Sequence, residues 1–145
     1  MKSKLPIRPL KGFNCFAKVF ENGKKFYVEN LLLITVSKDN ELIIKKSSQP
    51  NICYYGVGSS RKINKKGVIR NRIKRLLRES IRQLFVEKEI DLTYIKYCVL
   101  LYNKKVTHPK LIRLKDVKPL VKEAFDKANI YYNSNNNLNW NIFLS

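Results

Sequence analysis

The sequence predicts a single α+β domain whose elements follow in the order α-β-β-β-α-β-α. Two stretches with apolar residues at helical spacing, residues 67–85 and 114–128, enclose a β-rich stretch at residues 94–102. Shorter β-rich stretches precede them. The chain has 145 residues, 44% of them hydrophobic, which suits one domain of ordinary size. We therefore expect a folded domain over residues 1–132 and an Asn-rich tail over residues 133–145.

The first half is expected to hold an arm, a short helix and strands. Residues 1–11 contain Pro6 and Pro9 and are predicted to be extended. A helix is predicted over residues 12–21, where apolar side chains share one face, and Asn22-Gly23 ends it with a residue that tolerates positive φ. The predicted strands are residues 25–28, 31–36, 42–44 (a hairpin return after Asp39-Asn40) and 53–57.

The second half is dominated by a long amphipathic helix, predicted over residues 67–85. Its apolar stripe consists of Ile69, Ile73, Leu76, Leu77, Ile81 and Leu84. A strand over residues 94–102, a loop around residues 107–109 and a last helix over residues 114–128 follow. The Asn-rich residues 133–139 are expected to be mobile.

The charge balance indicates a polyanionic partner. Lys and Arg number 30 against 11 Asp and Glu, which gives a formal charge of +19. A membrane is disfavoured, because the most apolar run, residues 31–36, is far shorter than the ~20 residues of a spanning helix. The basic start lacks a secretory apolar segment, and three scattered cysteines suit reduced thiols in a cytoplasmic protein. Nucleic acid is therefore the expected partner.

The basic residues gather on the long helix and the loop before it. At about 100° per residue, Asn71, Arg75, Arg78 and Arg82 fall on one face, opposite the apolar stripe. The planar guanidinium group of arginine binds phosphate oxygens through paired hydrogen bonds. A charged helix face that serves only solubility normally contains acidic residues as well. Lys65 and Lys66 oppose the helix dipole, which indicates an anionic ligand at the helix start. The residues predicted to bind RNA are Arg61, Lys62, Lys65, Lys66, Arg70, Asn71, Arg72, Lys74, Arg75, Arg78 and Arg82.

Residues 70–80, which begin Arg-Asn-Arg, resemble the RNR signature of the bacterial ribonuclease P protein family. Residues 56–62 resemble the family's strand and loop before that signature, and residues 16–23 resemble its first helix, so the likeness spans about residues 8–131. It implies an α/β sandwich with a left-handed βαβ crossover. It also implies that the helix binds the catalytic RNA and that a cleft between the first helix and the sheet binds the 5′ leader of precursor tRNA.

Carried over by position, Arg70, Asn71, Arg72, Lys74, Arg75 and Arg78 would contact the RNA subunit. Phe16, Phe20 and Tyr131 would line the leader cleft, although both phenylalanines could instead be core residues. The chain departs from the family pattern at Ile34, where many relatives have tyrosine. It also departs in a long segment at residues 38–52 and in the Asn-rich tail.

No catalytic or metal-binding residue is predicted in this chain. Glu87, Glu89 and Asp91 are expected to be solvated, and His108 is the single histidine. The resemblance implies that the RNA subunit, with its bound Mg²⁺, cleaves the phosphodiester bond of precursor tRNA as an endoribonuclease. The protein would bind no cofactor and would pair 1:1 with the ribonuclease P RNA.

Three other functions remain open. A structural RNA-binding protein, such as a ribosomal protein, fits the charge and size but not the RNR signature. A DNA-binding regulator would need a helix-turn-helix partner upstream, yet residues 53–60 read as strand. A metal-dependent protein nuclease would need a carboxylate cluster, which the sequence does not suggest.

Overall fold

The computed structural model describes residues 7–10, 12–40 and 52–144. Its elements run in the order β1 (Ile7–Pro9), α1 (Phe13–Asn22), β2 (Lys24–Val28), β3 (Leu31–Ser37), β4 (Cys53–Gly58), α2 (Gly67–Val86), β5 (Ile95–Tyr102), the 3-10 helix η1 (Pro109–Leu111) and α3 (Leu114–Leu144). The predicted α+β class and the order of the predicted helices are confirmed. The predicted hairpin return at residues 42–44 lies outside the described residues.

One five-stranded sheet has the order β1-β4-β5-β3-β2. β3 pairs antiparallel with β2 and β5, whereas β4 pairs parallel with β1 and β5. Because β4 and β5 are adjacent and parallel, α2 between them forms the crossover of a βαβ unit. The left-handed sense of this crossover stays a prediction.

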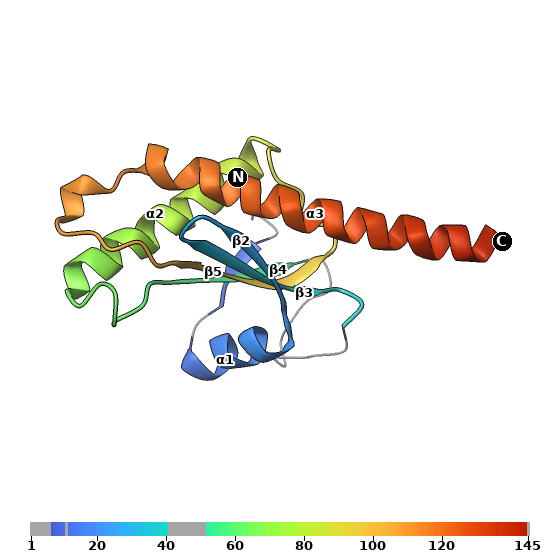
Figure 1. Cartoon of the computed structure of the whole chain (residues 1–145), viewed down its shortest axis with the longest axis horizontal. Coiled ribbons are helices and arrows are strands. Elements are labelled where there is room, and N and C mark those ends of the chain that lie inside the picture. Colours follow the sequence, from blue (N-terminus) through green and yellow to red (C-terminus); the bar gives the residue numbers. More distant parts are fainter. Residues whose placement is uncertain (1–6, 11, 41–51, 145) are drawn as a thin grey trace, which may run out of the picture.

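The sheet is covered on both faces. α1 lies on one face, and α2 and α3 lie together on the other (Figure 1). The buried side chains form one cluster on each face, and successive residues of β3 alternate between them: Leu31 and Leu33 join the cluster under α2 and α3, and Leu32 and Ile34 join the cluster under α1. A strand buried on both faces reads as a continuous apolar run, which explains residues 31–36.

The N-terminal arm departs from the prediction, because residues 7–9 form the edge strand β1. Ile7 is buried and is aligned with Cys53, and the Leu10 N–H donates to the Tyr55 carbonyl at 2.6 Å. Proline is tolerated on an edge strand, where no neighbour needs its missing N–H. This three-residue strand pairs with residues more than forty positions away, so it leaves no local pattern in the sequence.

Two helix ends also differ from the prediction. Gly23 follows α1 with φ −90°, so positive φ is not its role; an added Cβ would lie 2.4 Å from Ile34 Cγ2. α3 continues to Leu144, so the predicted end at residue 128 is wrong, and residues 133–139, expected to be mobile, are part of the helix. Asn disfavours a helix only weakly, and no Gly or Pro follows Pro119 to end it.

Candidate nucleic-acid interface

Helix α2 carries the predicted basic face, and its apolar stripe fixes which way that face points. Ile69, Ile73, Leu77 and Ile81 are almost fully buried against the sheet and α3. The opposite side is exposed at Asn71, Arg75, Arg78 and Arg82, while Arg70, Arg72 and Lys74 are half-buried at its flanks. The predicted division of the helix into an apolar and a basic side is confirmed.

Several of the arginines already have partners within the chain. Arg70 Nη1 donates to the carbonyls of Asn64 at 2.9 Å and Lys65 at 2.7 Å. Arg72 Nη2 donates to the Ile112 carbonyl at 3.3 Å, which ties α2 to the segment after η1. These two guanidinium groups therefore hold loops in place.

Arg82 is paired with the single acid of the basic face. Its Nη2 lies 2.5 Å from Glu79 Oε1, and this hydrogen bond, followed by that from Gln83, lowers the pKa of the Glu79 carboxyl. In the part of the chain that the structure describes, Lys74, Arg75 and Arg78 make no hydrogen bond or ion pair. Their charges are the ones left for a ligand.

The loop before α2 is equally basic. Arg61, Lys62, Lys65 and Lys66 are exposed, and α2 begins without a side-chain cap or an acid in its first turn. Asn64 is the exception in this loop, because only 2% of its surface is exposed. The predicted basic residues of the loop therefore flank Asn64, whose side-chain amide is buried.

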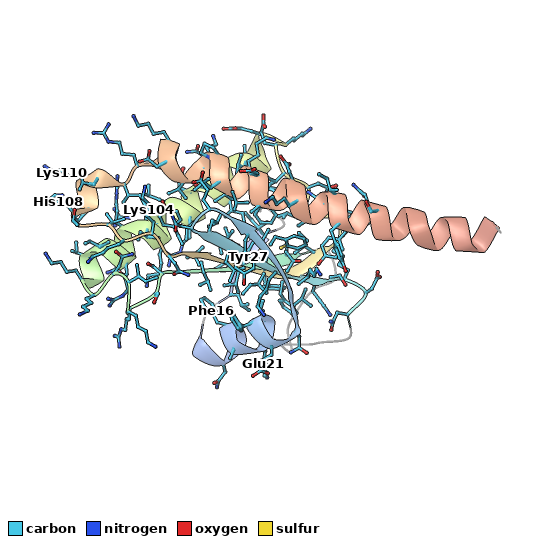
Figure 2. The ribbon with its side chains drawn as sticks, viewed as in Figure 1. Phe16, Glu21, Tyr27, Lys104, His108 and Lys110 are labelled. Atoms are coloured by element: carbon cyan, nitrogen blue, oxygen red, sulfur yellow. The ribbon has the colours of Figure 1, made fainter. Side chains whose placement is uncertain are left out.

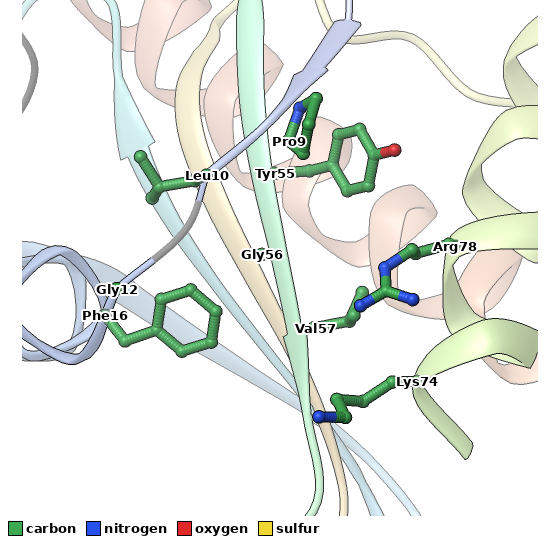
Figure 3. A pocket seen from close by; sticks show the side chains of 9 residues that line it. All are labelled: Pro9, Leu10, Gly12, Phe16, Tyr55, Gly56, Val57, Lys74 and Arg78. Atoms are coloured by element: carbon green, nitrogen blue, oxygen red, sulfur yellow. The ribbon is translucent and has the colours of Figure 1, made fainter. Parts of the chain in front are cut away.

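A cleft of about 350 Å³ opens between α1 and α2 at the edge of β4. β1 pairs only as far as Tyr55, so the next residues of β4 have an open edge. Figure 3 shows the Phe16 ring on one side of this edge, and Lys74 and Arg78 reaching toward it from the other. The cleft thus combines an aromatic ring with two cations that have no partner among the described residues.

Gly56 allows the Phe16 ring to lie against β4. A Cβ at position 56 would lie 2.6 Å from Phe16 Cε1 and 2.7 Å from Cζ. Phe16 is half-buried and packs against the cluster under α1, and Figure 2 shows it pointing from α1 toward the sheet, whereas Glu21 points away. Phe16 is therefore both a packing residue and a wall of the cleft.

Phe20 lies one turn further along α1 and is 47% exposed, so it is not a core residue. It lines a second, apolar cleft of about 310 Å³ together with Phe16, Ile34 and Leu101. Lys25 Nζ lies 4.4 Å from the centre of the Phe20 ring, which suits a cation–π contact. The structure thus brings Phe16 and Phe20 together on the sheet face that was predicted to hold the cleft.

The predicted third aromatic, Tyr131, lies elsewhere. It belongs to α3, on the opposite face of the sheet, where its ring is 5.8 Å from that of Phe26 and 4.9 Å from Lys24 Nζ. The prediction that Tyr131 lines the cleft is therefore wrong. It followed from position along the chain, and α3 packs on the face away from α1.

Tyr27, which the sequence did not single out, is an aromatic residue on the α1 face of the sheet. Phe26 and Val28 point into the cluster under α2 and α3, so alternation along β2 directs Tyr27 to the α1 side. Its aligned partner Leu32 belongs to the cluster under α1, and Tyr27 is 62% exposed. The alternation of residues 26–28 indicates that Tyr27 points to the opposite face from Phe26 and Val28. Which helix covers that face cannot be told until the arrangement of the sheet is known.

The comparison with protein families decides the relationship. The family model described as Ribonuclease P matches residues 7–129. The chain belongs to this family.

Relatives within the ribonuclease P family support the assignment. A ribonuclease P protein component of Rickettsia prowazekii is 30% identical over 102 residues, which cover 70% of this chain and 80% of that protein. One from Prochlorococcus marinus is 35% identical over 83 residues, covering 55% of this chain and 65% of that protein.

Solved ribonuclease P proteins share the fold. The Thermotoga maritima protein has a TM-score of 0.59 at 18% identity, covering 83% of this chain and 96% of that one. The Staphylococcus aureus protein has a TM-score of 0.55 at 18% identity, covering 83% and 94%. At 18% sequence identity, this similarity establishes that the folds are shared and says nothing about ligands.

Three of the four other groups considered for chemistry make contacts within the chain. Glu87 pairs with Lys118 at 3.1 Å, Asp91 accepts from the Thr93 N–H at 2.9 Å, and His108 Nδ1 accepts from the Lys110 N–H at 3.1 Å. Within the described ranges, no three His, Cys, Asp or Glu side chains are grouped as a metal site would need. In the same ranges, no helix has the length and apolarity needed to cross a membrane.

Proposed function

We propose that this chain is the protein subunit of a ribonuclease P holoenzyme, pairs 1:1 with the RNA subunit in the cytoplasm, and assists removal of the 5′ leader from precursor tRNA. The observation that carries the proposal is the placement of Lys74, Arg75 and Arg78. These cations project from α2 without partners among the described residues, and Lys74 and Arg78 line the Phe16 cleft. One surface can thus serve a folded RNA and a single strand.

The basic face of α2 is suited to the backbone of a folded RNA. Arg75 and Arg78 present planar guanidinium groups from a helix that is fixed by its buried stripe, so little backbone order has to be gained on binding. Each contact that neutralises a phosphate releases counterions, which makes affinity depend steeply on salt. We assign this face to the ribonuclease P RNA.

The clefts beside α1 are suited to a single strand. Phe20 and Phe16 offer aromatic surface on which unpaired bases can stack, at about 1–3 kcal/mol per base. Lys74 and Arg78 reach the neighbouring opening at the edge of β4 from the side opposite Phe16, where they can neutralise backbone phosphates. We assign these clefts to the leader of precursor tRNA, which mature tRNA lacks.

The bond-breaking chemistry is assigned to the RNA subunit and Mg²⁺ bound to it. Glu87, Asp91 and His108 are engaged in contacts of their own, and they lie on separate segments rather than around the clefts. The protein then acts by reducing repulsion between two RNAs, which lowers the Mg²⁺ concentration that cleavage requires.

The test is cleavage of precursor tRNA at low Mg²⁺ by a cognate ribonuclease P RNA, with and without this protein. Cleavage at the mature 5′ end that depends on the protein, with no activity from the protein alone, is the expected result. Tight RNA binding without stimulation would instead indicate a structural RNA-binding protein. Cleavage by the protein alone would refute the assignment of the chemistry to RNA.

A further inference from the structure

A second basic cleft lies at the start of α2, away from Phe16. Its volume is about 520 Å³, and four lysines line it: Lys62, Lys65, Lys66 and Lys105. The first three belong to the loop before α2, whereas Lys105 comes from the loop after β5. No Asp or Glu lines this lysine cleft.

Among the described residues, no acid is paired with any of the four ammonium groups. All four residues are exposed, and among the described residues their side chains make no hydrogen bond or ion pair. Like charges around one cleft repel each other. An anion bound in the cleft would reduce this repulsion. A site with this composition selects phosphate groups rather than a neutral ligand.

The two loops are held together by the buried side chain of Asn64. Its Nδ2 donates to the Lys104 carbonyl at 2.9 Å, and its Oδ1 accepts from the Val106 N–H at 2.8 Å. Its backbone carbonyl accepts from Arg70 of the RNR segment at 2.9 Å. Lys105, between the two residues held by the amide, is therefore presented to the cleft by a fixed backbone.

The lysine cleft and the surface already described are formed by adjoining segments of the same two loops. A further opening of about 360 Å³ is lined by Phe16, Lys74, Ser60 and Asn103. The Ser60 N–H donates to Asn103 Oδ1 at 3.2 Å, and beyond this bond the loops continue to Lys62 and Lys105. A polynucleotide that lies along Phe16 and Lys74 thus has a path to the four lysines.

We propose that the lysine cleft is a second phosphate-binding site for RNA, with Lys105 as a contact residue outside the basic segment 61–82. The proposal rests on the proposed function and extends its surface to the loop after β5. The ligand is a phosphodiester chain, supplied by the RNA subunit or by the leader of precursor tRNA.

The test compares Lys105→Gln with Lys104→Gln in the full chain. Lys104 is the neighbouring residue and is also exposed. Both lysines line a hollow that contains Glu29 and Asp116, but only Lys105 also lines the lysine cleft. Figure 2 places Lys104 at the same end of the molecule as His108 and Lys110. Both variants lose one charge from the same loop, so a difference between them reports the cleft and not the net charge.

Two affinities are measured against salt: protein for the isolated RNA subunit, and holoenzyme for precursor tRNA with leaders of different length. Lys105→Gln is expected to weaken one of them about fivefold to tenfold and to reduce its salt slope by about one, with Lys104→Gln close to the unchanged protein. Loss with the isolated RNA assigns the cleft to the RNA subunit. Loss only with long-leader substrate assigns it to the leader.

Equal affinities and salt slopes for both variants in both assays would overturn the proposal. The proposed function fails separately, if the unchanged protein neither binds the RNA subunit nor stimulates cleavage. Circular dichroism and thermal unfolding of both variants should match the unchanged protein, because neither side chain has a partner among the described residues.

Discussion

Gly56 determines how closely Phe16 can approach the sheet. Gly56→Ala would place a methyl group 2.6 Å from the Phe16 ring, so the ring or α1 has to move. We expect the free energy of unfolding to fall by about 1–3 kcal/mol, as for other overpacked sites. Precursor tRNA affinity should fall as well, because the displaced ring forms a wall of the cleft that we assign to the leader. Urea unfolding and substrate binding measure the two effects.

Gly67→Ala is the matched control for this substitution. The nearest atom to its added Cβ is Arg70 Nη2 at 3.6 Å, an ordinary contact at the end of a flexible side chain. Since alanine favours a helix over glycine, this variant should be as stable as the unchanged protein or more so. A similar loss at both positions would show that crowding at Phe16 is not the cause.

Asn64 is the residue on which the two basic loops depend. Asn64→Ala leaves the buried Val106 N–H without its acceptor, so we expect stability to fall by about 1–3 kcal/mol. The exposed Asn22, whose amide donates to Lys18 of its own helix, provides the control. Urea unfolding of Asn64→Ala and Asn22→Ala compares them, and an equal, small change in both would contradict the role of Asn64.

The sequence could predict which side of α2 is basic and exposed, but not which of its arginines have partners within the chain. Helical periodicity placed Arg75 and Arg78 on the outer face correctly. Arg70 and Arg72 look equivalent to them in the sequence, yet they bind main-chain carbonyls of Asn64, Lys65 and Ile112. Ile112 lies forty residues from Arg72, so the contact depends on how η1 packs, which local spacing does not contain.

At the scale of the element, α2 should separate binding from stability. Arg75→Glu with Arg78→Glu reverses two exposed charges without touching the buried stripe. We expect RNA-subunit affinity to fall about 100-fold at moderate salt and the salt slope to fall by about two. The free energy of unfolding should change by only about 0.5 kcal/mol. Filter binding and urea unfolding measure these quantities.

Lys38→Glu with Lys88→Glu is the control for the α2 pair. It makes the same change in net charge with two exposed lysines beyond the end of the sheet where β5 begins, opposite the lysine cleft. Its RNA affinity should fall much less. If both pairs weaken binding equally, total charge rather than the face of α2 governs the affinity.

Helix α1 allows a similar separation at Phe20. Because Phe20 is 47% exposed, Phe20→Ala should change stability little, while losing a stacking surface of about 1–3 kcal/mol for a leader base. Precursor tRNA should therefore lose affinity and mature tRNA should not. Ile130→Ala, on α3 and 66% exposed, is the control. Equal losses for the two tRNAs would remove Phe20 from the leader cleft.

Elements with local apolar patterns were predicted well, and those defined by distant contacts were not. The stripe of α2 and the continuous run of β3 fix those elements within a few residues. β1 is a strand only because β4 lies beside it, and Tyr131 is separated from Phe16 only because α3 packs behind the sheet. Neither fact is present in the spacing of residues.

At the scale of the whole molecule, stability should fall at alkaline pH. Burial is the main cause that raises the pKa values of Tyr55, Tyr102 and Tyr132 above the ordinary 10.0, and a hydrogen bond with Cys53 raises that of Cys98 above 9.0. The unfolded chain therefore loses these protons at lower pH than the folded chain, so unfolding becomes easier as pH rises above about 9.

Urea unfolding at pH 7, 9 and 10 measures this loss. Tyr102→Phe removes one of the raised groups, so its stability should decline less between pH 7 and pH 10. A stability that stays constant over this range in the unchanged protein would contradict the prediction. On the acid side, Glu79 has a lowered pKa but is exposed, so its protonation should matter little.

The position of β5 in the sheet has a consequence for the order in which the molecule can assemble. β5 lies between the β1–β4 pair and the β2–β3 hairpin, yet it follows all four of them along the chain. While the protein is being synthesised, the first 94 residues can form two separate halves of a sheet and the basic helix, but nothing joins them. The apolar stripe of α2 therefore leaves the ribosome before its packing surface is complete: β5 has to arrive to join the two halves of the sheet, and α3 has to follow to finish the cover of the helix.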